Sequence, residues 1–170
     1  SVGWNETRLL LKQKKRSEAL AVADKTNKLF PDDVEGMGVL GSCLRLSNNF
    51  DESLKYLNKA IELNPNYVEV LINRGLIRLA RDNKESALLD LEKAHKLKPH
   101  IKQIWDLVLS LKMRAKDFEK AIILAGEMIK IDPSNEKIFA SIALCYQHLN
   151  NYDQTVVFYK KALTLKPDYA

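Results

Sequence analysis

The sequence has few cysteines and no long apolar segment. Its two cysteines, Cys43 and Cys145, lack the spacing of a disulfide framework, which favours a reducing compartment, the cytoplasm. No apolar run approaches the roughly 20 residues that a bilayer-spanning helix needs, and residues 1–11 mix charges with apolar residues, unlike a signal peptide. We therefore expect a cytoplasmic protein without membrane insertion. Because the chain does not begin with methionine, we interpret it as a piece of a longer protein.

Side-chain arrangements typical of catalysis are also missing. No Ser-His-Asp or Cys-His set and no converging carboxylate pair has a plausible scaffold, and His95, His100 and His148 lack metal-ligand spacing. Residues 36–41 (GMGVLG) satisfy the GxGxxG string of dinucleotide-binding proteins, but that motif follows a strand. Here the string follows a proline turn, and we expect Gly41 to serve helix packing rather than phosphate binding. We expect no enzyme activity, no cofactor and no metal.

The net charge of +5 raises the question of a nucleic-acid partner. A nucleic-acid surface gathers Lys and Arg on one face and interleaves aromatic residues, whereas here the surplus is spread along the chain. The one dense cluster, residues 12–16 (KQKKR), falls in an expected turn between helices. A solvated turn is the favoured interpretation over a phosphate-binding role. We expect no nucleic-acid partner.

The chain has only five prolines, and they recur every 34 residues. They are Pro31, Pro65, Pro99, Pro133 and Pro167. A branched aliphatic residue stands two positions before each of them, at Leu29, Leu63, Leu97, Ile131 and Leu165. Such a register predicts a tandem repeat with units 1–33, 34–67, 68–101, 102–135 and 136–170, which we interpret as one domain.

Each unit reads as two helices joined by a short turn. In the second unit, the pattern predicts helices over 34–46 and 51–63, since Leu54, Leu57 and Ile61 share one stripe. Asn and Asp in the turns 47–49, 81–83 and 149–151 tolerate the left-handed backbone of a helix end. Acidic residues then open the second helices, at Asp51, Glu85, Glu119 and Asp153. Gly41 and Gly75 are expected to let the first helix approach Ala60 and Ala94 of the second.

A single hairpin cannot bury its apolar stripe alone, so the units must stack. The predicted fold class is therefore all-α, a solenoid of five tandem 34-residue helix-turn-helix repeats with a concave inner face.

These columns carry a family resemblance. A 34-residue period with a small eighth residue, an aromatic or aliphatic eleventh residue, alanines at the twentieth and twenty-seventh positions and a proline at the thirty-second resembles the tetratricopeptide repeat over the whole chain. It is similar to the repeat arms of O-GlcNAc-transferase-type proteins. Thr7 and Leu109 depart from the small eighth position, and Arg78 and Lys112 occupy the usual aromatic position, so these units are expected to pack less tightly. The resemblance implies a right-handed superhelix whose first helices line a peptide groove.

Carried onto this chain, the resemblance implies groove residues in the first helices of the units. The candidates are Arg8, Ser42, Arg45, Asn73, Leu76, Asp106, Ser110, Met113, Lys137 and Ser141. Asn73 has two interpretations, because its carboxamide could grip an extended backbone or could tie two adjacent helices together. No window of three units matches the lysine, asparagine and arginine set with which one subfamily clamps a terminal carboxylate.

Three functional hypotheses follow. The first is a non-catalytic scaffold that binds a protein or peptide partner in its groove. The second is the substrate-docking arm of a larger glycosyl-, sulfo- or methyltransferase, because the sequence stops where a further unit should begin. The third is a scaffold that self-associates, as a homo-oligomer, through uncapped ends.

Overall fold

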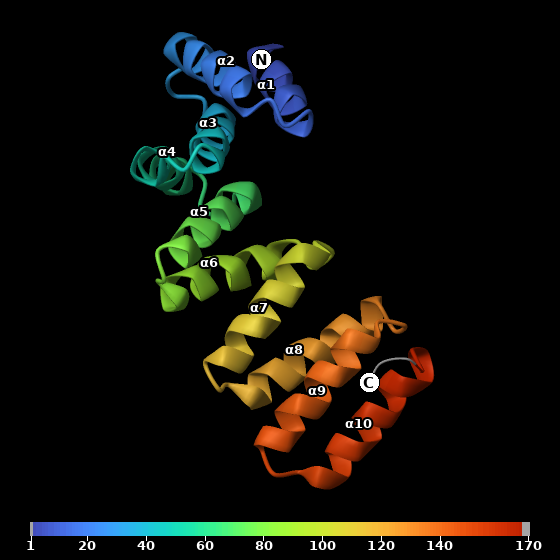
Figure 1. The fold of residues 1–170 in the computed structure, drawn as a ribbon. Coiled ribbons are helices and arrows are strands. Elements are labelled where there is room, and N and C mark those ends of the chain that lie inside the picture. Colours follow the sequence, from blue (N-terminus) through green and yellow to red (C-terminus); the bar gives the residue numbers. More distant parts are fainter. Residues whose placement is uncertain (1, 168–170) are drawn as a thin grey trace. The chain divides into compact units, whose positions relative to one another are not determined.

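The computed structural model describes residues 2–167, without the side chain of Gln103, and these residues form ten α-helices and no strand (Figure 1). Ser1 and residues 168–170, which belong to the first and last predicted units, lie outside the described residues. The helices are α1 (Val2–Lys12), α2 (Arg16–Leu29), α3 (Val34–Leu46), α4 (Phe50–Leu63), α5 (Val68–Ala80), α6 (Lys84–Leu97), α7 (Lys102–Arg114), α8 (Phe118–Ile131), α9 (Glu136–His148) and α10 (Tyr152–Leu165). The predicted all-α array of tandem hairpins is confirmed.

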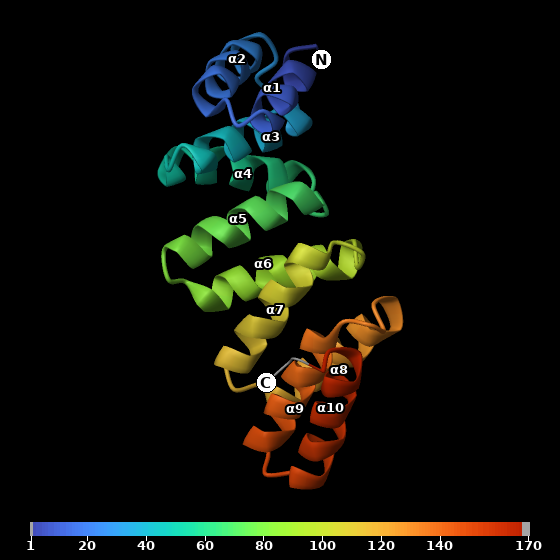
Figure 2. The ribbon, with the colours of Figure 1, turned by 45° about the vertical axis from the view of Figure 1, so that its right-hand side comes forward.

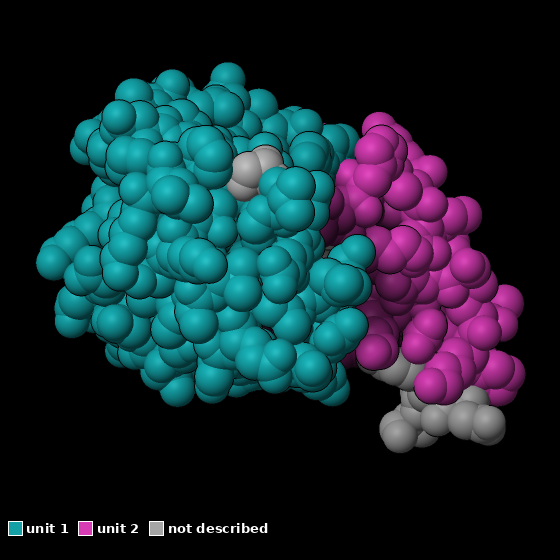
Figure 3. Space-filling view, turned by 90° about the horizontal axis from the view of Figure 1, so that it is seen from above, with its two compact units in different colours: residues 1–99 teal, residues 100–170 magenta. Residues whose placement is uncertain are grey.

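The helices group into two compact units, residues 1–99 (unit 1) and residues 100–170 (unit 2), drawn in teal and magenta in Figure 3. Unit 1 contains α1 to α6, which follow one another in chain order (Figure 2). Unit 2 contains α7 to α10. In each unit, neighbouring helices along the chain pack against each other. The interpretation of the chain as one domain stays a prediction.

The turns inside the hairpins repeat one backbone geometry. Five residues have φ between 58° and 61°, at Lys14, Asn48, Asp82, Lys116 and Asn150. These positions are 34 residues apart, so every hairpin closes its first helix with one left-handed residue. The prediction from Asn and Asp is confirmed at three of the turns. Lys14 and Lys116 adopt the same conformation because the packing of the hairpin demands it, although lysine gives no local signal for it.

Helix boundaries agree closely with the sequence pattern. The second helices end at the branched aliphatic residue that lies two positions before each proline, since proline and the residue before it disfavour helix. They begin at Phe50, Lys84, Phe118 and Tyr152, one residue earlier than the predicted acidic residues. Asp51 and its equivalents still lie in the first turn, where they face the positive end of the helix dipole.

The first hairpins of unit 1 share a dense apolar core. Trp4 and Ala19 are fully buried in it together with Leu40 and Leu44 of α3. Farther along unit 1, Leu57 of α4 and Ile77 of α5 belong to a second buried cluster. These clusters lie between successive helices, which is why no hairpin can form its core alone.

The Arg78 position shows how unit 1 accommodates a departure from the repeat pattern. Asp90 of α6 is 4% exposed, and it accepts hydrogen bonds from Arg74 Nη2 at 2.7 Å and Arg74 Nε at 2.9 Å. Arg78 Nη1 donates to the same carboxylate at 2.7 Å. Two guanidinium groups and one carboxylate thus fill the space that apolar side chains fill elsewhere. The Asp90 carboxylate is thus satisfied by three donors, and the expectation that this unit packs less tightly stays a prediction.

The glycines of the first helices are close-packed, but against different residues than predicted. A Cβ at Gly41 would lie 2.5 Å from Leu57 Cδ2, and one at Gly75 would lie 2.9 Å from Leu91 Cγ. The nearest atoms therefore belong to these leucines rather than to Ala60 and Ala94. Ser53 Oγ also donates to the carbonyl of Gly41 at 2.6 Å, an approach that a side chain at position 41 would crowd.

Gly41 and Gly126 are predicted to respond oppositely to alanine. Gly126 lies inside α8 with nothing within 4 Å of an added Cβ, so Gly126→Ala is expected to raise the free energy of unfolding by about 0.5–1 kcal/mol. Gly41→Ala is expected to lower it by about 1–3 kcal/mol through overpacking against Leu57. Urea unfolding followed by circular dichroism measures both. A destabilised Gly126→Ala protein would contradict the assignment of open space at that helix face.

Candidate functional site

A hollow of about 640 Å³ opens between α7 and α9 of unit 2. Its lining residues on α7 are Asp106, Leu109, Ser110, Met113 and Arg114, and those on α9 are Lys137, Ala140, Ser141 and Leu144. We call it the α7–α9 hollow. Five of the ten predicted groove residues line it: Asp106, Ser110, Met113, Lys137 and Ser141.

Helical spacing explains how each helix presents these residues. On α7, Asp106, Ser110 and Met113 lie four and three residues apart, and on α9 Lys137, Ser141 and Leu144 repeat this spacing. Residues at such intervals share one helix face. The opposite faces of both helices are buried, for example at Val108 and Ile142. Leu109 and Ala140, 4% and 5% exposed, are buried lining residues, so the hollow lies where the core meets the polar side of each helix.

The lining combines an apolar surface with charges of both signs. Leu109, Met113, Ala140 and Leu144 supply the apolar part, and Leu144 is 40% exposed. Asp106, Arg114 and Lys137 supply the charges. In the part of the chain that the structure describes, these three side chains make no ion pair or hydrogen bond with other side chains. They are therefore available to an approaching molecule.

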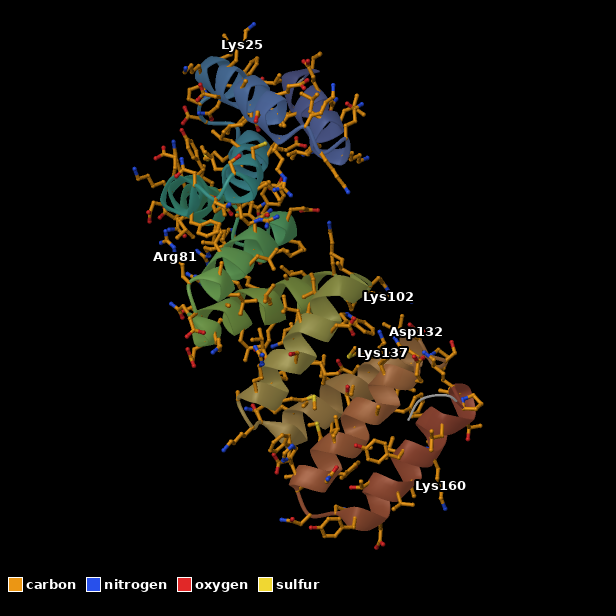
Figure 4. All side chains as sticks on the ribbon, viewed as in Figure 1. Lys25, Arg81, Lys102, Asp132, Lys137 and Lys160 are labelled. Carbon is orange, nitrogen blue, oxygen red and sulfur yellow. The ribbon has the colours of Figure 1, made fainter. Side chains whose placement is uncertain are left out.

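The first turn of α9, which carries Lys137, is held in place by its neighbours (Figure 4). Asn135 caps this helix, its side chain accepting from the backbone N–H of Lys137 at 3.2 Å. The Asn135 amide also donates to Asp132, and Lys102 Nζ donates to the same carboxylate at 2.9 Å. The hydrogen bond from Lys102 lowers the pKa of Asp132 below its ordinary value, so this carboxylate stays ionised as a tie between the start of α7 and the turn before α9.

Two serines contribute hydroxyl groups to the α7–α9 hollow. Ser141 Oγ donates to the carbonyl of Lys137 at 2.9 Å within its own helix, so it retains only acceptor capacity. Ser110 is exposed. The hollow thus offers hydrogen-bonding groups, yet nothing that resembles an activated nucleophile.

Three candidates of the second and third repeats, Ser42, Arg45 and Asn73, lie in unit 1 and form hydrogen bonds with one another. Asn73 is 9% exposed; its Oδ1 accepts from Arg45 Nε at 2.7 Å, and its Nδ2 donates to Ser42 Oγ at 2.8 Å and to the Glu69 carbonyl at 2.7 Å. Both donor hydrogens of the carboxamide are engaged. With these hydrogen bonds Asn73 links α3 to α5. This corresponds to the interpretation in which Asn73 connects two helices, rather than the one in which it binds a partner backbone.

Arg8 and Leu76 lie elsewhere in unit 1. Arg8 Nη2 donates to Glu35 at 2.5 Å. Burial alone would lower the pKa of Arg8, but the hydrogen bond and charge of Glu35 outweigh it and raise that pKa. Leu76 is half-buried on α5. Neither residue belongs to the α7–α9 hollow, so the candidate set divides between the two units.

Four residues line the hollow although they were absent from the ten candidates: Leu109, Arg114, Ala140 and Leu144. Arg114 ends α7 four residues after Ser110, an interval that places both on one face. That spacing was readable from the sequence. Leu109 was interpreted only as an exception to a small residue, and its contribution to the hollow becomes visible only once α9 lies beside it.

The other signals of the sequence have structural explanations. The glycines of residues 36–41 lie inside α3, where they pack rather than form a phosphate loop. Cys43 and Cys145 are free and buried, and burial raises the pKa of each thiol to about 11. Across residues 2–167, no three His, Cys, Asp or Glu side chains are grouped as metal ligands. Within the same residues, no helix has the length and apolar character to cross a membrane.

The chain resembles known proteins in two of its repeats and in its fold. Residues 35–67 and 137–169 match the tetratricopeptide repeat model. The UDP-N-acetylglucosamine--peptide N-acetylglucosaminyltransferase of Giardia intestinalis is 33% identical over 69 residues, which are 41% of this chain and 5% of that protein. Anaphase-promoting complex subunit 3 of Schizosaccharomyces pombe is 22% identical over 144 residues, 85% of this chain and 22% of that protein. The chain thus spans under a quarter of either relative.

Two crystal structures share the arrangement of helices. MamA superposes with a TM-score of 0.80 at 21% identity, over 98% of this chain and 91% of that one. YrrB, described as a tetratricopeptide-repeat protein with an unusual peptide-binding site, has a TM-score of 0.80 at 17% identity, over 98% of this chain and 86% of that one. At such identities the likeness concerns the fold. The matched residues 35–67 and 137–169 are thus tetratricopeptide repeats, and the array of 34-residue hairpins has the fold of tetratricopeptide-repeat proteins.

Proposed function

We propose that the chain is a non-catalytic scaffold and that the α7–α9 hollow binds a segment of a partner polypeptide. The observation that carries the proposal is the combination of an apolar lining with three charged side chains that have no partner of their own among the described residues. Structural charges on helix surfaces commonly form ion pairs with neighbours, as Lys120 and Asp117 do in the same unit. Asp106, Arg114 and Lys137 are available for a partner instead.

The chemistry of the lining indicates what kind of segment fits. Leu109, Met113, Ala140 and Leu144 offer an apolar surface for one or two aliphatic or aromatic side chains of the partner. Two cations against one anion favour a segment with a net negative charge. Methionine adds an adaptable contact, since its thioether chain fits differently shaped side chains. The proposed ligand is therefore a short acidic segment with an apolar anchor residue.

Reversing the charge of Lys137 or Arg114 in the α7–α9 hollow tests the proposal. Short peptides selected from a displayed random library on the full chain are expected to be acidic and to contain an apolar anchor. Lys137→Glu or Arg114→Glu is expected to weaken their binding about tenfold, since each variant replaces an attraction by a repulsion. Fluorescence anisotropy measures the affinity.

Lys160→Glu is the matched control, because Lys160 is exposed on α10 of the same unit and does not line the hollow (Figure 4). It makes the same charge change and is expected to leave the affinity within about twofold. Equal losses for Lys137→Glu and Lys160→Glu would mean that only the overall charge matters. Unchanged binding in both hollow variants would rule out the hollow as the binding site.

The hypothesis of a docking arm for a larger transferase is compatible with this proposal. Its support is the similarity to part of the Giardia N-acetylglucosaminyltransferase, of which this chain covers 5%. In that case the acidic segment would belong to the substrate of a further domain. The hypothesis of self-association stays a prediction.

A further inference from the structure

A second hollow, of about 580 Å³, lies in unit 1 and is lined by residues of α2, α3 and α4. It is lined by Ser17, Leu20, Ala21 and Asp24 of α2, by Leu40 and Leu44 of α3, by Ser47, and by Glu52 and Tyr56 of α4. We call it the α3 hollow. It belongs to a different unit from the α7–α9 hollow, and none of its residues is among the groove candidates.

The repeat itself provides an internal comparison for this hollow. Thirty-four residues further along, Leu40, Leu44 and Tyr56 are replaced by Arg74, Arg78 and Asp90. There the two arginines fill the corresponding position and bind Asp90. In the last repeat, which belongs to unit 2, the equivalent residues are Ile142, Tyr146 and Phe158, and the rings of Tyr146 and Phe158 stack with their centroids 5.6 Å apart. Long or aromatic side chains of the chain thus occupy two of these equivalent positions.

At the α3 hollow the shorter Leu40 and Leu44 leave the space open. Both are nearly completely buried, at 2% and 6% exposure, and they form its apolar floor together with Leu20 and the half-buried Tyr56. The only charged lining residues are Asp24 and Glu52, both acidic, in a chain whose net charge is +5. The charged side chains that line this hollow are therefore opposite in sign to the net charge of the chain.

We propose that the α3 hollow receives an arginine side chain from a partner polypeptide. In the next repeat, Arg74 Nη1 donates to Asn58 Oδ1 at 2.9 Å, and Arg78 Nη1 donates to the carbonyl of Ser86 at 3.1 Å. Asp24 occupies the position that corresponds to Asn58, and Glu52 the position that corresponds to Ser86. A partner's arginine thus finds the Asp24 carboxylate where Arg74 finds the neutral Asn58 amide, and the Glu52 carboxylate on a residue whose counterpart Ser86 offers Arg78 only its backbone carbonyl.

The other groups of the hollow suit the same side chain. The methylene groups of arginine pack along Leu40 and Leu44, and the planar guanidinium lies against the ring of Tyr56. Asp24 and Glu52 already pair with Lys28 at 2.9 Å and Lys55 at 3.3 Å. These pairs are exposed and therefore weak, so a guanidinium that binds a carboxylate in a bidentate manner displaces them at little cost.

Methyl NMR of the full chain tests the proposal with four capped pentapeptides that differ only at the central residue of an alanine background. The central residues are arginine, citrulline, lysine and tyrosine. The arginine peptide is expected to shift the methyl signals of Leu20, Leu40 and Leu44 in a saturable manner. Citrulline has the same shape without the charge, so its peptide is expected to bind about tenfold more weakly.

Asp24→Asn and Glu52→Gln are expected to weaken binding of the arginine peptide several-fold, whereas Asp153→Asn, at an exposed carboxylate of α10, leaves it unchanged. Equal binding of the arginine and citrulline peptides, tighter binding of the tyrosine peptide, or the absence of saturable shifts would each overturn the proposal. Because the α7–α9 hollow lies in unit 2, these outcomes are independent of the test of the proposed function.

Discussion

Asp90→Ala is expected to lower the free energy of unfolding of unit 1 by about 3 kcal/mol. The Asp90 side chain is 5% exposed, and those of Arg74 and Arg78 are 16% and 27% exposed. Removing the carboxylate leaves two largely buried guanidinium groups without their acceptor, which typically costs about 3–5 kcal/mol. The residual exposure of the arginines favours the lower end of that range. Urea unfolding monitored by circular dichroism measures the change.

Two further variants distinguish the loss of the buried Asp90 network from the loss of a charged side chain at any position. Asp51→Ala breaks the pair of Asp51 with Arg81, in which the Asp51 side chain is 85% exposed, and is expected to cost less than about 1 kcal/mol. The triple variant Arg74→Leu, Arg78→Leu, Asp90→Tyr installs the residues of the preceding repeat and is expected to be nearly neutral, because it removes all three charges together. An Asp90→Ala protein as stable as the Asp51→Ala protein would show that the network contributes nothing to stability.

Trp4→Ala is expected to destabilise unit 1 by about 3–5 kcal/mol, the usual cost of deleting a fully buried tryptophan. Trp4 is 0% exposed, and its Nε1–H donates to Asp33 Oδ2 at 2.6 Å. The other oxygen of Asp33 accepts from the backbone N–H of Glu35 and so caps α3. The indole thus joins α1 to the start of the next hairpin, and its loss affects both. Thermal and urea unfolding both measure the effect.

Gly36→Ala provides the matched double-mutant cycle. A Cβ at Gly36 would lie within 2.9 Å of three atoms of the Trp4 indole, so Gly36→Ala alone is expected to destabilise the protein by overpacking. In the Trp4→Ala background the same methyl group enters the cavity left by the indole, and the cost is expected to vanish or change sign. Strict additivity of the two substitutions would mean that the indole does not pack against Gly36.

Much of the fold could be predicted from the sequence, because the repeat is local and periodic. Prolines at a constant interval locate the ends of the second helices, and the apolar stripe of α4 identifies its buried face. Even the left-handed turn residue was predictable where Asn or Asp stands, as at Asn48 and Asn150. Lys14 and Lys116 were not, since a lysine adopts positive φ only when the surrounding hairpin enforces it.

The candidate sites were predictable only in part. Asp106 and Lys137 were among the groove positions that the family resemblance implied, so both were named before their surroundings were known. An asparagine amide can bind a partner backbone or link two helices of the chain, and the sequence is the same in both cases. Only the distances from Asn73 to Arg45 and Ser42 distinguish the two geometries. The α3 hollow had no signal of its own, because an unfilled space depends on the lengths of side chains from three helices at once.

The sequence by itself determined the number, length and order of the helices and the class of the fold. Each of these depends on residues within one 34-residue period, where propensity, capping and proline act locally. Only the tertiary structure decided which polar groups are satisfied within the chain and which stay available, as with Asp90 and Asp106. The physical reason is that hydrogen bonding and burial depend on distances between helices from different repeats, and a one-dimensional pattern does not contain those distances.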